Sequence, residues 1–389
     1  MASPASEPAQ EARTRAPLRD LCLYFLKLGT IGFGGPAALV GYMRKDLVEE
    51  RKNLDEPTFN LALALAQIMP GPLAAQTAVA IGYFEGGIAG ATLVGLVFIL
   101  PSFLMVLGLS ALYVAYGGLP WMQALFYGIG AVVIAIIAIA AYRLARGTNK
   151  KDPLLWGIFT LLLLATVLLQ TELAVLFLLS GLLAILVRAW PGPRGAAVLT
   201  AVCALGAALI WSMETFLLNA GAFGGENVLL QILIFFTKAG SFVFGSGLAI
   251  VPFLQQGVVH DLGWLTDHQF LDAVAVALIT PGPVVITVAF IGYLVAGPAG
   301  AALAAIGIFL PVYVFTIVPA PWFKRHRDNP QLRAFASGAT AAASGAIAGA
   351  VIVLGQRAVY DVPTVLIALV GLGLLWKFRT QEPLLVGGA

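Results

Sequence analysis

The sequence predicts an all-α polytopic membrane protein with two inverted-topology repeats and broken or re-entrant helices. Three observations support this prediction: charged residues are scarce, long apolar segments follow one another, and two parts of the chain repeat with opposite loop charge. Of the 389 residues, 60% are hydrophobic and 11% are charged, whereas soluble domains average about 45–50% apolar and about 25% charged residues. So few charges cannot cover the surface of an ordinary soluble enzyme, and they offer no basic patch for nucleic acid. The lipid bilayer is the expected environment.

The apolar segments reach the length of about 20 residues that a transmembrane helix needs. The first series lies near residues 21–43, 58–82, 88–114, 120–142, 154–170, 172–188 and 196–217. The second series lies near residues 228–256, 270–294, 298–320, 331–356 and 361–378. Their continuous Leu- and Ala-rich runs predict helices, because a membrane barrel would show short segments of alternating polarity.

Polar ends flank these segments. Residues 1–19 contain Arg13, Arg15 and Arg19 but no apolar core of a secretory signal, so we expect a disordered tail on the cytoplasmic side. Residues 381–389 are expected to form a short C-terminal tail.

Two stretches of the chain repeat each other. Lys27 recurs as Lys238 at a spacing of 211 residues, and the whole Pro-Gly-Pro of residues 70–72 recurs at 281–283 with the same spacing. After a one-residue deletion the spacing becomes 210, as in Gly82-Tyr83 and Gly292-Tyr293. The repeats therefore cover residues 20–170 and 231–380. Residues 171–230 are expected to form two linking transmembrane helices.

Loop charges indicate that the second repeat is inverted. The loop after the first broken segment holds Arg44, Lys45, Arg51 and Lys52, whereas the matching loop, 257–269, has no Lys or Arg. Residues 115–120 are uncharged, whereas their counterpart holds four basic residues, namely Lys324, Arg325, Arg327 and Arg333. Opposite bias at equivalent positions is what inversion predicts when basic loops stay inside.

The broken segments either span the membrane or re-enter it. Both cases give an odd number of crossings between Lys27 and Lys238, so the inversion holds in either case. Re-entry places the basic loop that contains Arg44 on the same side as the other basic clusters. We therefore favour re-entrant hairpins, with full spanning as the alternative.

Each repeat has two breaks within apolar segments. Proline lacks an amide donor and disfavours helix in the residue before it, so a helix cannot continue undisturbed through Pro-Gly-Pro. The half-helix that follows a break presents free amides and a positive dipole end, which suit an anion. The alternative is that Gly and Pro serve kinks and close packing. The predicted substrate-binding positions at the breaks are Gly34, Gly35, Pro36, Pro70, Gly71, Pro72, Gly245, Ser246, Gly247, Pro281, Gly282 and Pro283.

Polar side chains near the breaks complete the predicted site. Hydroxyls and amides there would donate to an oxyanion or satisfy freed carbonyls, and the candidates are Gln67, Gln76, Ser241, Thr280 and Thr287. Lys27 and Lys238 would compensate the charge of an anion, or else extend to the membrane interface. Asp272 is the candidate for ion coupling, because an ionisable residue inside the membrane is rare and costly.

No enzyme chemistry is predicted. His260, His268 and His326 have no metal-ligand spacing, and the chain has no phosphate-binding loop and no nucleophile–base pairing. Cys22 and Cys203 lie in apolar surroundings without a CxxC spacing, which favours packed thiols. We therefore expect no metal, no cofactor and no catalytic residue.

The motifs resemble those of the chromate ion transporter family in its long two-domain form. In the first half they are Phe25-Leu26-Lys27-Leu28-Gly29, Gly32-Phe33-Gly34-Gly35-Pro36 and Ala66-Gln67-Ile68-Met69-Pro70-Gly71-Pro72. In the second half they are Phe236-Thr237-Lys238-Ala239-Gly240, Phe244-Gly245-Ser246-Gly247 and Thr280-Pro281-Gly282-Pro283. The second half has Ser246-Gly247 where the first has Gly35-Pro36, so the halves are expected to contribute unequally.

The resemblance implies chromate efflux and chromate resistance in a bacterial or archaeal plasma (inner) membrane. An ion gradient would drive the export, and sulfate would compete with chromate. The alternatives are a transporter for sulfate or another inorganic anion, an anion channel of the same architecture, and a membrane scaffold or sensor, although a scaffold explains neither the inversion nor the breaks. The sequence does not determine the oligomeric state, and a homodimer is one assembly that it allows.

Overall fold

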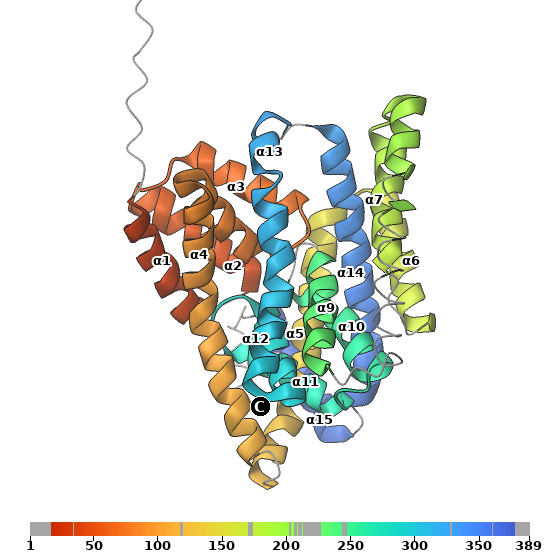
Figure 1. Ribbon diagram of the computed structural model, residues 1–389. Coiled ribbons are helices and arrows are strands. Elements are labelled where there is room, and N and C mark those ends of the chain that lie inside the picture. The colour runs from red at the N-terminus through yellow and green to blue at the C-terminus, as the bar shows by residue number, and fades with distance from the viewer. Residues whose placement is uncertain are drawn as a thin grey trace, which may run out of the picture.

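The computed structural model describes residues 17–33, 35–116, 120–169, 174–201, 227–242, 247–326, 329–359 and 361–377, with four single positions between 204 and 212. These parts are helical and contain no strand (Figure 1). Four helical stretches among them are long and apolar enough to cross a membrane, namely Leu73–Tyr116, Tyr127–Asn149, Val284–Ile317 and Pro330–Gln356. The expected all-α polytopic membrane fold is confirmed.

The helices of the first half break where the sequence predicts. Its elements are α1 (Leu18–Ile31), α2 (Gly35–Met43), the π-helix η1 (Arg44–Glu50), α3 (Glu56–Ile68), α4 (Leu73–Tyr116), α5 (Pro120–Asn149), α6 (Pro153–Leu169) and α7 (Ala174–Arg188). The glycine break ends α1, and the first Pro-Gly-Pro separates α3 from α4. α1 has 14 residues and is therefore about 21 Å long, which is shorter than the hydrocarbon core of about 30 Å.

The second half repeats these boundaries. Its elements are α9 (Val228–Ser241), η2 (Gly247–Ile250), α10 (Val251–Gln255), η3 (Gln256–Asp261), α11 (Asp267–Ile279), η4 (Val284–Ile286), α12 (Thr287–Ile317), α13 (Ala320–His326), α14 (Pro330–Ala358) and α15 (Val362–Lys377). α11 begins and ends 211 residues after α3, and α14 begins 210 residues after α5. The spacing read from the sequence therefore recurs in the helix boundaries.

Both long helices bend at the same repeat position. Inside α4, Gly87 has φ 62° and ψ −152°, and inside α12, Gly297 has φ 61° and ψ −154°. A side chain disfavours this backbone conformation, whereas glycine adopts it readily. The two arms of each bent helix then lie together, because Gly82 faces Gly90 and Gly292 faces Gly300.

The two halves meet along α4 and α12, which run antiparallel. Thr92, early in the second arm of α4, lies 2.6 Å from the hydroxyl of Tyr313, late in α12. Tyr113, near the end of α4, stacks edge-on against Phe290, near the start of α12, with ring centroids 5.1 Å apart. Figure 1 shows the same relation, since α4 descends toward its end while α12 rises to α13.

The broken segments fold back on themselves. Arg51, just after η1, lies 5.3 Å from the ring of Tyr24 in α1, so the chain returns to the level of the first half of α1. In the second half, Phe235 of α9 stacks on Phe253 of α10 with centroids 5.6 Å apart. Each pair of short helices therefore forms a hairpin, and this arrangement supports re-entry.

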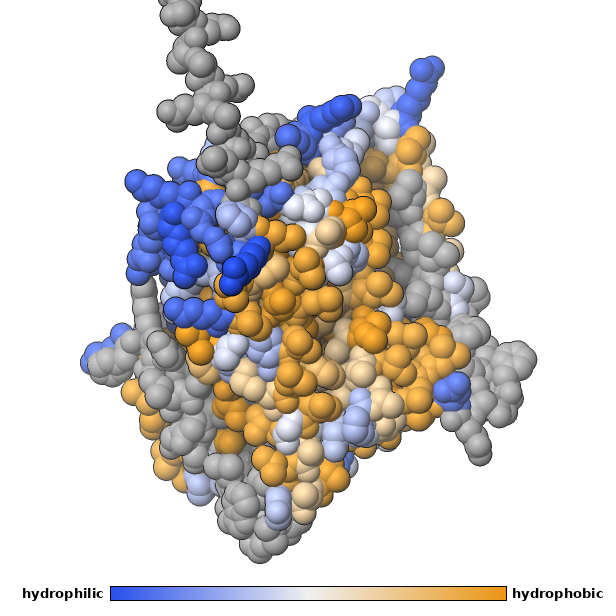
Figure 2. Space-filling model, turned by 60° about the vertical axis from the view of Figure 1, so that its left-hand side comes forward, coloured by the Kyte–Doolittle hydropathy of each residue, from blue (hydrophilic) through white to orange (hydrophobic). Residues whose placement is uncertain are grey.

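An apolar outer surface surrounds this bundle. Leu96, Leu100 and Leu104 form an exposed stripe on α4, and Ile306 and Leu310 occupy the equivalent positions on α12. Figure 2 shows hydrophilic side chains gathered at the upper part of one face above a broad hydrophobic area. Without a membrane such a surface would be unusually large, so it fits contact with lipid.

Candidate functional site

A cavity of about 840 Å³ lies where the four breaks converge. Its lining includes Gly35 and Pro36 at the start of α2, Leu73 at the start of α4, Leu248 in η2 and Val284 at the start of η4. Each of these residues is at or directly after a break in its half. The helical segments that resume after the breaks therefore begin at one shared space, which is the arrangement that an anion site from half-helix starts requires.

Three basic side chains line the same cavity. Arg143 comes from the last third of α5, Lys150 directly follows the end of that helix, and Arg333 comes from the first turn of α14. The guanidinium of Arg143 also donates to the carbonyl of Leu375 at 3.4 Å, at the end of α15. No Asp or Glu lines the cavity in the part of the chain that the structure describes. The lining therefore carries net positive charge and favours an anion.

Neutral polar groups add hydrogen-bonding capacity. Gln67 contributes from the end of α3, Thr148 from α5, and Ser337 and Thr340 from α14. Amides and hydroxyls can donate to an oxyanion from several directions. A few polar groups in a largely apolar pocket are typical of a small-molecule site.

The breaks of the two halves are bonded to each other. The amide of Gly282, within the second Pro-Gly-Pro, donates to the carbonyl of Gly32 at 2.9 Å, where α1 ends. In the first Pro-Gly-Pro, the side chain of Gln76 donates to the carbonyl of Pro70 at 2.6 Å, and its own amide oxygen is buried without a hydrogen-bond partner. The irregular backbone is thus held within protein, as it must be at membrane depth.

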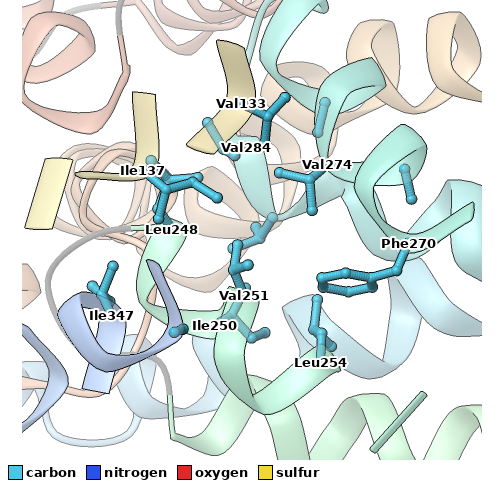
Figure 3. Packing of buried hydrophobic residues seen from close by; sticks show 14 of the residues in the cluster. Val133, Ile137, Leu248, Ile250, Val251, Leu254, Phe270, Val274, Val284 and Ile347 are labelled. Atoms are coloured by element: carbon cyan, nitrogen blue, oxygen red, sulfur yellow. The ribbon is translucent and has the colours of Figure 1, made fainter. Parts of the chain in front are cut away.

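A packed apolar layer borders the cavity. Figure 3 shows Val133 of α5, Val274 of α11 and Val284 of η4 close together, with Leu248 and Ile137 beside them. All five belong to one buried cluster. Leu248 and Val284 also line the cavity, and Val274 lies two residues after Asp272 on α11.

The predicted residues fall into different environments. Gly35, Pro36 and Gln67 line the cavity, and Gly247 is buried at the start of η2. The second Pro-Gly-Pro is fully buried behind the cavity residue Val284. Gly34, Gly245 and Ser246 lie outside the described residues.

The two lysines do not line the cavity. Lys27 is exposed on α1, beside the exposed Leu23 and Leu26. Lys238 is buried on α9, with its ammonium 5.4 Å from the ring of Phe253.

The predicted hydroxyls serve their own helices. Ser241 donates to the carbonyl of Thr237 at 2.9 Å, Thr280 to that of Val276 at 3.0 Å, and Thr287 to that of Val284 at 3.0 Å. In this conformation they satisfy carbonyls near the breaks, which is the second of the two roles considered for them.

Sequence reasoning missed the basic and hydroxyl residues of α5 and α14. The apolar segment that ends near residue 142 leaves Arg143 and Lys150 outside it, and Arg333 is counted with the basic loop before the segment that begins near 331. A signal was present, because Ile136, Ala140, Arg143 and Gly147 recur at helical spacing and all line the cavity. A helix that continues for two turns beyond residue 142 places Arg143 on this stripe.

Comparison with known proteins identifies the family of the chain. The sequence model of a family described as "Chromate transporter" matches residues 19–187 and 230–389. The chain belongs to the chromate transporter family. Membership makes it a membrane transport protein rather than a typical enzyme. The described residues contain no group of three His, Cys, Asp or Glu side chains that would hold a metal.

Named relatives cover almost the whole chain. A "Chromate transport protein" of Cupriavidus metallidurans is 53% identical, over 96% of this chain and 91% of the relative. A "Probable chromate transport protein" of Synechococcus elongatus is 52% identical, over 95% and 93%. A "Chromate transport protein" of Pseudomonas aeruginosa is 32% identical, over 92% and 86%. No solved structure matches the chain.

Proposed function

We propose that this chain is a secondary active transporter that exports chromate across the inner membrane, driven by an ion gradient. The observation that carries the proposal is the cavity in which the segments after four breaks meet Arg143, Lys150 and Arg333 without a carboxylate in the described lining. Chromate is a tetrahedral dianion, which such a lining would stabilise by charge and by several hydrogen bonds. Sulfate has the same shape and charge, so it should compete.

The proposed mechanism is alternating access between two inverted repeats. The antiparallel packing of α4 and α12, with Thr92 beside Tyr313 and Tyr113 beside Phe290, supports the inversion. Basic residues collect at the end of the bundle where α5 ends and α14 begins. By the positive-inside rule this end of the bundle, like the N-terminal tail, would face the cytoplasm. The described conformation would then be inward-facing, with its cavity available to cytoplasmic anion.

Binding by the cavity is tested with inverted membrane vesicles, in which export appears as uptake. We expect Arg143→Gln and Arg333→Gln each to raise the chromate concentration for half-maximal uptake about tenfold, since a hydrogen bond to a charged group contributes about 1.5–3 kcal/mol. Arg146→Gln is the matched control, because Arg146 lies one turn further along α5 and donates to Tyr142 rather than lining the cavity. Equal effects of all three variants would contradict the assigned site.

Coupling and specificity are tested in the same vesicles. We expect collapse of the pH gradient or membrane potential to abolish accumulation of labelled chromate, and unlabelled sulfate to reduce it competitively. Flux that is unchanged by both treatments and too fast for a carrier would instead identify an anion channel.

A further inference from the structure

Asp272 is a buried carboxyl group that the proposed binding cavity does not use. It lies in α11 with 9% of its surface exposed, and its Oδ2 accepts a hydrogen bond of 2.7 Å from the hydroxyl of Tyr113 in α4. None of the described residues forms an ion pair with it. An ionised carboxylate without a counter-ion is costly in such a place, so the buried pair calls for a functional explanation.

Few titratable groups act on this carboxyl. In the described structure they are Tyr113 of α4 and His268, which lies one turn earlier on α11 and is exposed. The other elements packed against α11 are α5, α12, η4, α10 and η3. None of their described residues forms a hydrogen bond or an ion pair with the Asp272 side chain. The hydrogen bond from Tyr113 is therefore the one polar contact of the Asp272 carboxyl in the described structure.

The pair lies far from the cavity along the bundle. Tyr113 is three residues from the end of α4, and α5 begins at Pro120, whereas the cavity contacts α5 only from Ile136 onward. Sixteen helical residues correspond to about 24 Å. Val133, three residues before the first cavity residue of α5, packs with Val274 and Val284 in one buried cluster (Figure 3).

The fold itself does not require this polar pair. The repeat counterparts of Asp272 and Tyr113 are Leu61 and Phe323, both buried in the apolar cluster of the other hairpin. Leucine and phenylalanine thus fill the equivalent space in the same backbone. The hydrogen-bonded pair therefore occurs at one of two equivalent places, on the face that the proposed inward-facing conformation would keep closed.

We propose that Asp272 and Tyr113 form a proton-binding site whose protonation favours closure of that face. The inference rests on the proposed transport function. When the face closes, the neutral acid is buried with its hydrogen bond to Tyr113. When the face opens, water reaches the carboxyl, and its proton passes to that water to leave the carboxylate. A ligand that binds one state better shifts the equilibrium toward that state, so acid on this side should favour the inward-facing form.

The test varies pH inside inverted vesicles, where the lumen contacts the proposed outer face, at constant external pH. We expect the initial rate of chromate uptake by the wild type to change at least fivefold between lumenal pH 6 and 8. Asp272→Asn should remove this dependence to within twofold. Tyr113→Phe should retain it with the midpoint at higher pH, because the carboxylate loses a donor. Asp361→Asn is the control, since Asp361 also accepts from a tyrosine, Tyr127, but lies at the exposed start of α15.

Each outcome has a definite meaning. Lumenal pH dependence that persists in Asp272→Asn, or an unmoved midpoint in Tyr113→Phe, would overturn the proton site. If Asp272→Asn does not fold, Tyr113→Phe and Asp272→Glu decide, because the Glu variant must keep a pH dependence with a changed midpoint. Absence of chromate uptake by the wild type would instead contradict the proposed transport function, which separates the two failures.

Discussion

The first and second halves of the molecule build the same helix crossing around different polar side chains. A Cβ atom at Gly29 of α1 would collide with the backbone carbonyl of Phe98, and one at Gly240 of α9 would collide with that of Ile308. The close approaches are therefore equivalent. Two residues before each of these glycines stands a lysine, but Lys27 is exposed and Lys238 is buried.

The two halves share their backbone features and differ in their polar side chains. Close crossings, breaks and bends recur, because both halves must hold interrupted helices inside a membrane. The hydrogen-bonded pair and the basic lining residues do not recur: Asp272 and Tyr113 stand opposite Leu61 and Phe323, and the cavity takes its basic side chains from one end of the bundle. Similar helix arrangements with unequal side chains give the two halves different properties.

The largest expected effect tests the shared crossing. Gly29→Ala and Gly240→Ala should each destabilise the protein by about 3 kcal/mol, because a methyl group pressed against a backbone carbonyl forces the helices apart. The measurement is the thermal stability and folded yield of purified protein in detergent. Gly108→Ala and Gly130→Ala are controls, since a Cβ atom there meets no neighbour within 4 Å. Tolerance in only one half would show that the crossings are not equivalent.

A smaller effect should distinguish the two lysines. Lys238→Met should reduce chromate uptake about tenfold while folded protein is retained, because a buried charge acts on an anion through a medium of low dielectric. Lys27→Met should change uptake by less than about twofold, since an exposed charge is screened. Uptake rates in inverted vesicles, normalised to folded protein, provide the comparison. Similar losses in both variants would mean that burial does not decide the role of this position.

The smallest expected effect concerns the equivalent starts of α6 and α15. Asp152 accepts from the amide of Leu154 at 3.0 Å, and Asp361 accepts from the amide of Thr364 at 3.0 Å. Hydrogen bonds from Thr364 and Tyr127 lower the pKa of Asp361. A carboxyl with a lowered pKa stabilises the fold above its unfolded value of about 3.9, and this contribution is lost as pH falls through the lower folded value.

We therefore expect Asp361→Asn to lower Tm by about 1–2 °C at pH 7. The difference from the wild type should shrink as the pH falls below about 4. Thermal unfolding followed at pH 7, 5, 4 and 3 checks both statements. A difference that stays constant down to pH 3 would assign the effect to packing rather than to the charge of Asp361.

The sequence predicted the fold well because local chemistry determines where helices stop. Pro-Gly-Pro ends a helix wherever it stands, so the boundaries at Ile68 and Ile279 followed from the motif. Of the proposed site residues, Gly35, Pro36 and Gln67 line the cavity. Arg143 and Arg333 were not found, because helix ends beside charged residues are hard to place from one sequence.

The sequence by itself determined the membrane class, the repeat and the breaks, since these follow from composition, spacing and the missing amide of proline. Only the tertiary structure decided which ionisable side chains meet. Arg143 and Arg333 share a cavity although 190 residues separate them, and Asp272 reaches Tyr113 from a distant helix. The direction of a side chain is set by the packing of helices that are remote in sequence, and the pattern along a single helix does not contain that information.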